Sequence, residues 1–251
     1  MEILPGIHTV PGVSWSRVYL IEDEALALID SGLPWSVRRV LDYITSIGRR
    51  LEELQLILTT HSHPDHTTGA RSISRRTGSV VAAHRLDTRT VSGGQTTLSF
   101  MGALHSLPLP FPFLARTPVQ RLVTDGEVLP LLGGLRVIHT PGHTPGSVCY
   151  LAETRGVLFS GDTAFSDGKR VSRSVPFTGY NGPHYRESLQ RLARLEFDTL
   201  CGGHGSPLVG GASDRLRDLL ARSPDPPTWG GFLRSIPGRL YRKRSLTGED
   251  L

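Results

Sequence analysis

The chain has 251 residues and a formal net charge of +5, with 28 glycines and 18 prolines. This length allows one large domain with a modest appendage, and the glycine and proline content argues against a helical bundle. The positive charge permits attraction to anions but identifies no partner. The two cysteines, Cys149 and Cys201, lie far apart without CxxC spacing, which argues against a disulfide framework and favours a reducing compartment.

Two stretches bear on export and membrane insertion. The opening residues, MEILPGIHTVPG, lack the basic and apolar regions of a secretory signal. The most apolar segment, residues 98–114, contains three prolines and a histidine, which do not suit a membrane-spanning helix. We therefore expect a cytoplasmic protein with no transmembrane segment.

The first third of the chain alternates between strand and helix patterns. Residues 17–22 and 25–30 are short β segments separated by a two-residue turn, which predicts a hairpin. Pro34 and Gly48 then bracket a helix whose apolar residues recur at helical spacing. A strand at 54–60, a short helix ended by Gly78 and a strand at 79–84 follow. This order is typical of an α/β fold.

The middle and last parts of the chain add a loop, further strands and two helices. Residues 93–118 are apolar and irregular, which predicts a lid or binding loop. Glycine-rich turns separate further β segments. These cover residues 127–131, 135–140, 147–153, 156–162 and 198–203. Helices are expected at 182–195 and 213–221.

The domain organisation follows from a change in composition at Ser223. Beyond this residue the chain is rich in proline, glycine and arginine. We predict a catalytic domain at residues 1–222 and a C-terminal tail at 223–251. The tail mixes aromatic and basic residues, and surface packing or disorder is its simplest interpretation.

Histidines and aspartates gather directly after the predicted strands. The stretch HSHPDH follows one strand, and three further candidates follow others. The full set is His61, His63, Asp65, His66, His143, Asp162 and His204. Imidazole and carboxylate are ligands that Zn²⁺ accepts, and seven of them suffice for two ions that share one carboxylate. Residues two apart point the same way in an extended chain, so His61 and His63 suit one ion. The turn at Pro64 redirects Asp65 and His66 toward another.

These motifs resemble the metallo-β-lactamase superfamily. The resemblance rests on LIDSGLP, HSHPDH, PGHTPGS, FSGDT and GGHG in this order, and covers roughly residues 3–220. It implies an αββα four-layer sandwich, with two mixed β-sheets flanked by helices and a dinuclear site at one edge of the sheets. It assigns one metal to His61, His63 and His143, the other to Asp65, His66 and His204, and a bridging position to Asp162. Asp30 matches an aspartate that supports the ligands, although it could also serve only to form a turn.

The chemistry expected from such a site is hydrolysis. Two divalent ions would activate a shared water as a bridging hydroxide. Zn²⁺ is the expected metal, with Fe or Mn as alternatives. Asp65 is the natural group to orient that hydroxide and pass a proton to the leaving group. Small esters, thioesters and lactones are the expected substrates. A loop is predicted after Asp162, at residues 166–185, and its Lys169, Tyr180 and His184 are candidate substrate-binding residues. A solvated basic surface is the alternative interpretation of this loop.

Several related activities compete with this interpretation. Glyoxalase II-type thioesterases and acyl-homoserine lactone lactonases resemble the chain most, although the segments after FSGDT and GGHG differ from the thioesterase pattern. Persulfide dioxygenases use the same scaffold with one iron, and nucleases act on phosphodiesters. The complete ligand set argues against the dioxygenase, and against an inactive binding module. The absence of extra domains makes nucleic acid an improbable partner, and the apolar loop is compatible with a homodimer.

Overall fold

The first β-sheet is built mainly from the N-terminal part of the chain. The computed structural model describes residues 1–91, 94–97, 117–176 and 179–222, with no side-chain description for 90–97. Within these residues the sheet has seven strands in the order β1-β2-β3-β4-β5-β6-β10. They are β1 (Glu2–Leu4), β2 (Ile7–Thr9), β3 (Tyr19–Glu22), β4 (Leu26–Ile29), β5 (Leu54–Leu58), β6 (Val80–His84) and β10 (Arg121–Val123). The strands β1 to β4 are antiparallel, whereas β4, β5, β6 and β10 are parallel.

The second sheet comes from the C-terminal half of the described chain. Its order is β11-β12-β13-β14-β17-β19. The strands are β11 (Val128–Leu129), β12 (Leu135–His139), β13 (Val148–Ala152), β14 (Val157–Gly161), β17 (Thr199–Gly202) and β19 (Leu208–Val209). There are also two small three-stranded sheets among the described residues. One has the order β16 (Val171–Arg173), β15 (Ala164–Asp167), β18 (Gly205–Ser206). The other has the order β7 (Thr88–Val91), β8 (Gly94–Thr97), β9 (Pro118–Val119).

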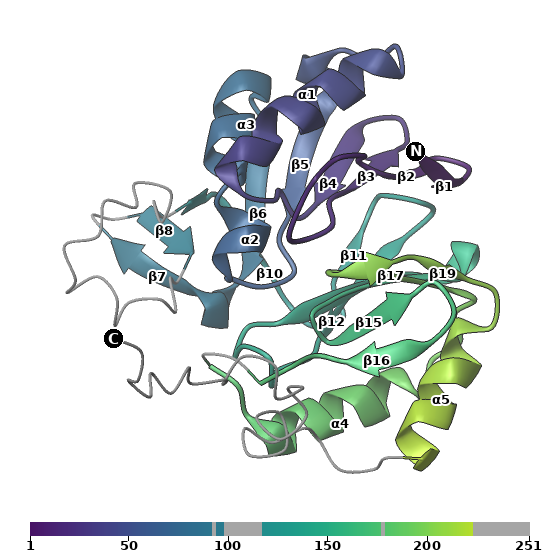
Figure 1. Ribbon diagram of the computed structural model, residues 1–251. Coiled ribbons are helices and arrows are strands. Elements are labelled where there is room, and N and C mark those ends of the chain that lie inside the picture. The colour runs from purple at the N-terminus through teal and green to yellow at the C-terminus, as the bar shows by residue number, and fades with distance from the viewer. Residues whose placement is uncertain (92–93, 98–116, 177–178, 223–251) are drawn as a thin grey trace, which may run out of the picture.

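Helices cover the outer faces of both large sheets. They are α1 (Val37–Ser46), α2 (Pro64–Thr67), α3 (Ala70–Thr77), α4 (Gly182–Leu192) and α5 (Ala212–Arg222). Figure 1 shows α1 and α3 on the first sheet and α4 and α5 on the second, so the layers run helix, sheet, sheet, helix. A strand covered on both faces is apolar throughout rather than alternating. Accordingly every residue of β4, β13 and β14 is buried.

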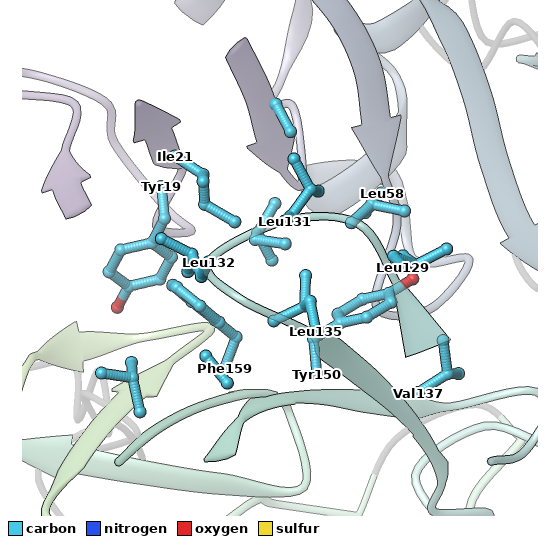
Figure 2. Packing of buried hydrophobic residues seen from close by; sticks show 14 of the residues in the cluster. Tyr19, Ile21, Leu58, Leu129, Leu131, Leu132, Leu135, Val137, Tyr150 and Phe159 are labelled. Carbon is cyan, nitrogen blue, oxygen red and sulfur yellow. The ribbon is translucent and has the colours of Figure 1, made fainter. Parts of the chain in front are cut away.

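The central apolar layer lies between the two sheets. Tyr19, Ile21 and Leu58 descend from the first sheet onto Tyr150 and Phe159 of the second, as Figure 2 shows. The rings of Tyr19 and Phe159 meet edge-on at 5.6 Å. Two outer apolar layers complete the core. One lies between the first sheet and the helices α1 and α3, and the other between the second sheet and the helices α4 and α5. These three apolar layers between four layers of structure are the packing of an αββα sandwich.

The fold confirms the predicted architecture and corrects some of its details. The short helix expected before Gly78 is α3, which begins at Ala70, and the turn expected at Pro64 is the one-turn helix α2. The loop expected after Asp162 contains the hairpin β15–β16. Most of the predicted lid at 93–118, and all of the tail at 223–251, lie outside the described residues. No helix in the described ranges has both the length and the hydropathy of a membrane span.

Candidate metal centre

The seven candidate side chains come from strand ends that meet at one edge of the two sheets. The HSHPDH segment follows β5 of the first sheet and runs into α2. His143, Asp162 and His204 follow β12, β14 and β17 of the second sheet. A hydrogen bond from Val148 N to Thr60 O, 2.8 Å long, joins the sheets at this edge. The cluster therefore lies on the seam between the two sheets.

Three histidines and Asp162 form the more deeply buried group. Their ligand atoms all lie within 4.8 Å of one another. His63 Nδ1 is 3.1 Å from His61 Nε2 and 2.9 Å from His143 Nε2. Three ring nitrogens thus converge on one point, with Asp162 Oδ2 3.3 Å from His143 Nε2.

Asp65, His66 and His204 form the second group, which opens toward solvent. Asp65 Oδ2 lies 3.5 Å from the Nε2 atoms of both His66 and His204. The side chains of Asp65 and His204 are 23% and 31% exposed, whereas His66 is fully buried. Asp162 also reaches this group, with Oδ1 3.3 Å from His66 and Oδ2 3.3 Å from His204. Asp162 consequently lies between the two groups.

The donor set fits divalent metal ions. His66 Nε2 and Asp162 Oδ1 are buried and face each other at 3.3 Å, but neither makes a hydrogen bond among the described residues. Each such unpaired polar atom costs about 1–3 kcal/mol. Five imidazoles and two carboxylates that point their lone pairs inward are the ligands of a borderline ion such as Zn²⁺. A cation in this position would satisfy the unpaired atoms.

A second layer of hydrogen bonds orients the ligands through their outer nitrogens. Asp30 accepts a 2.7 Å bond from His66 Nδ1 and bonds from the N–H and hydroxyl of Thr60, each 2.8 Å long. The Thr60 hydroxyl in turn lies 3.0 Å from His61 Nδ1. Such contacts fix which nitrogen faces the metal and raise its basicity. Asp30 thus contacts one candidate ligand directly and a second through Thr60.

Two of the other histidines, His143 and His204, have supports that the sequence did not indicate. Ser174 Oγ lies 2.9 Å from His143 Nδ1, and the Trp15 carbonyl accepts a 2.6 Å bond from His204 Nδ1. Trp15 has a φ of 77° and is 75% exposed. A non-glycine residue with positive φ persists only where its surroundings hold it. The Ser16 hydroxyl, which donates to the Asp65 carbonyl, provides part of that restraint.

Electrostatics divide four of the five histidines of the cluster into two kinds. Burial lowers the pKa of His61 well below its usual value and that of His143 to about 3. Burial also acts to lower the pKa of His66, but the carboxylates of Asp65, Asp162 and Asp30 outweigh it and raise that pKa to about 10. His204 behaves similarly, because hydrogen bonding to Asp162 outweighs burial and raises its pKa. The two kinds of histidine belong to the two groups.

The three predicted substrate-binding residues lie in different places. Tyr180 packs against Tyr185 with ring centroids 5.3 Å apart, and its hydroxyl is buried without a hydrogen-bond partner among the described residues. His184 lies in the first turn of α4 and lines an open hollow of about 230 Å³ with His139 and Arg191. Lys169 lies at the exposed β15–β16 turn. The ligand groups do not line the hollow at His184.

A profile of the metallo-beta-lactamase superfamily matches residues 12–204. The chain belongs to the metallo-β-lactamase superfamily. This superfamily member is 28% identical to the probable metallo-hydrolase YflN of Bacillus subtilis, over 83% of this chain and 87% of that one. It is 32% identical to a hydroxyacylglutathione hydrolase of Rhodospirillum rubrum, over 78% of this chain but 65% of the hydrolase. The crystal structure of TTHA1623 in a di-iron-bound form superposes with a TM-score of 0.62 at 26% identity, covering 84% of this chain and 97% of that one.

The comparisons and the geometry together establish the general activity. This member of the metallo-β-lactamase superfamily is a metal-dependent hydrolase with a His/Asp metal-binding site. The motifs that predicted the family lie around this site.

Proposed function

We propose that the chain is a dinuclear hydrolase that acts on small esters, thioesters or lactones with a bridging hydroxide. His61, His63 and His143 would bind one ion, and Asp65, His66 and His204 the other. The position of Asp162 is the observation that supports this assignment best. Its two carboxylate oxygens lie 3.3 Å from histidines of both groups, which is the placement that a bridging ligand needs.

The chain's own residues would control proton transfer and access. Two divalent ions lower the pKa of a shared water and polarise a carbonyl oxygen. Asp65 has the more exposed of the two carboxylates in the cluster, at 23% against 7% for Asp162. It can therefore hold the proton of the attacking water and deliver it to the departing alkoxide or thiolate. Asp162 is buried against three histidines, and these lower its pKa although burial acts to raise it, so it stays ionised.

The substrate class is drawn from the surroundings of the open group. Trp15, whose backbone carbonyl accepts a bond from His204, is a largely exposed apolar residue, which favours a substrate with an apolar part. The similarity to a hydroxyacylglutathione hydrolase supports thioesters, but the match spans 65% of that enzyme. Esters and lactones therefore remain within the proposed class.

Zn²⁺ is the proposed metal, because imidazole and carboxylate ligands suit it. TTHA1623, by contrast, was solved with two irons. Metal analysis of protein purified without added metal would distinguish the two. Two ions per chain are expected, and a single iron with oxygen uptake on a persulfide would instead support the dioxygenase.

The decisive experiment compares substrates and variants together. Metal-analysed protein is assayed with a panel of thioesters, lactones, esters and phosphodiesters. His61→Ala and Asp162→Ala should abolish turnover of any substrate that the wild type cleaves. His8→Ala is the matched control, because His8 is equally buried and hydrogen-bonded but lies outside the cluster. Unchanged turnover in both site variants would refute the assignment.

A further inference from the structure

Asp87 is a buried carboxylate that belongs to neither ligand group. It is the last residue of the 3-10 helix Arg85–Asp87, which follows β6, and it is 1% exposed. Burying a carboxylate is unfavourable unless charge-assisted hydrogen bonds compensate it. Three donors surround this one, and both of its oxygens accept bonds. Burial nevertheless raises the pKa of Asp87 above its usual value.

The donors come from the two loops that carry the three-histidine group. Ser62 N, which donates to Asp87 Oδ2 at 2.8 Å, lies between His61 and His63 in the chain. The hydroxyl of Thr144, the residue after His143, donates to the same oxygen at 2.7 Å. Gly146 N donates to Oδ1 at 2.7 Å. One carboxylate therefore joins segments that are about 80 residues apart in sequence.

The packing around Asp87 leaves little freedom. A Cβ on Gly146 would lie 2.5 Å from Asp87 N and 2.7 Å from Asp87 Cγ, so glycine is required for the approach. The Thr144 hydroxyl also lies 2.7 Å from Ser147 Oγ, which accepts a bond from Thr144 N. The turn after His143 is thus fixed from both sides, by Asp87 and by Ser147.

We propose that Asp87 is a positioning residue that locks the His61–His63 loop to the His143 loop and thereby sets the metal affinity of the three-histidine site. This inference rests on the ligand assignment in the proposed function. Its donor in the HSHPDH segment, Ser62, lies between His61 and His63, whereas His66 of that segment is held by Asp30 and His204 by the Trp15 carbonyl, so the effect of Asp87 should fall mainly on the three-histidine site.

The test measures metal affinity at each site separately. His204→Ala removes a ligand of the second site and leaves the three-histidine site, whereas His63→Ala does the reverse. Asp87→Asn is added to each background, and Zn²⁺ and Co²⁺ affinities of metal-free protein are measured by chelator competition. We expect a 10–100-fold loss in the His204→Ala background, the range for supporting partners of metal ligands. In the His63→Ala background the change should stay below about threefold, well under that range.

Two further variants guard against a folding defect. Thr144→Val removes one hydroxyl that donates to Asp87 and should weaken the three-histidine site about tenfold, whereas Thr144→Ser keeps the hydroxyl and should restore it. Asp198→Asn is the control for exchanging a loop-organising carboxylate, because Asp198 accepts Gly211 N at the opposite end of β17 from His204. Circular dichroism verifies that each variant is folded.

Each outcome bears on the inference. Loss at the three-histidine site alone, with rescue by Thr144→Ser, supports it. Equal loss at both sites, or wild-type affinity in folded Asp87→Asn or Thr144→Val protein, overturns it. If Asp87→Asn does not fold, the Thr144 pair decides. Because affinity is measured without substrate, the inference can hold even if the proposed hydrolysis fails.

Discussion

Metal binding at the two sites should release different numbers of protons. A pKa of about 10 leaves His66 protonated at pH 7 in all but about one molecule in a thousand. Its Nδ1 proton is engaged by Asp30, so the Nε2 proton must leave before a metal can bind. The three pKa units between pH 7 and 10 correspond to about 4 kcal/mol of lost affinity. His61 and His143 have depressed pKa values and release no proton.

The assay is calorimetric titration of Zn²⁺ into metal-free protein in buffers with different ionisation enthalpies. The His63→Ala background should release at least one proton per ion at pH 7, and its affinity should rise about tenfold per pH unit below 10. The His204→Ala background should show a much weaker pH dependence. Acidification should therefore empty the Asp65–His66–His204 site first. Equal proton release at the two sites would refute the reasoning.

The raised pKa of His66, which weakens metal binding at pH 7, stabilises the fold of the metal-free protein at that pH. Because His66 binds its proton more tightly when folded, this contribution to stability is complete below pH 6.5. It should be lost as the pH rises through about 10.

Three further predictions concern stability and loading. Asp30→Ala leaves three buried donors without their acceptor. It should therefore lower the free energy of unfolding of metal-free protein, measured by urea titration, by about 3 kcal/mol or more. A change under about 1 kcal/mol would contradict this. Gly203→Ala overlaps Asp162 Oδ1, so metal content by mass spectrometry should fall while the fold persists. Burial and a stacked neighbouring histidine lower the pKa of His84 to about 4, so stability should decline from pH 6.5 toward 4, and His84→Phe should flatten that slope.

The clustering of the candidate ligands was predictable because their signal is local. His61, His63, Asp65 and His66 occupy one short segment after a strand, and glycine-rich turns mark the strand ends elsewhere. The apolar runs that form β4, β5 and β14 can likewise be recognised from the local sequence alone. Both signals depend on residues adjacent in the chain.

The supporting contacts could not be predicted in this way. Ser174 and Trp15 lie 31 and 189 residues from the histidines that they orient, and a serine or a backbone carbonyl has no distinctive pattern. The hairpin β15–β16 was interpreted as a loop because its residues are largely polar. The close approach of Gly69, just before α3, to the Ser31 carbonyl is a tertiary contact that the local sequence does not show.

The origin of the ligands in both sheets has a mechanical consequence. Four of the seven candidate side chains follow the first sheet and three follow the second. Ions held by both would act as removable cross-links between the two halves of the protein, so their binding energy would add to the cohesion of the sandwich. Depletion by a chelator would then loosen this seam first and expose it to proteases. The lifetime of the protein would thereby depend on the supply of free metal.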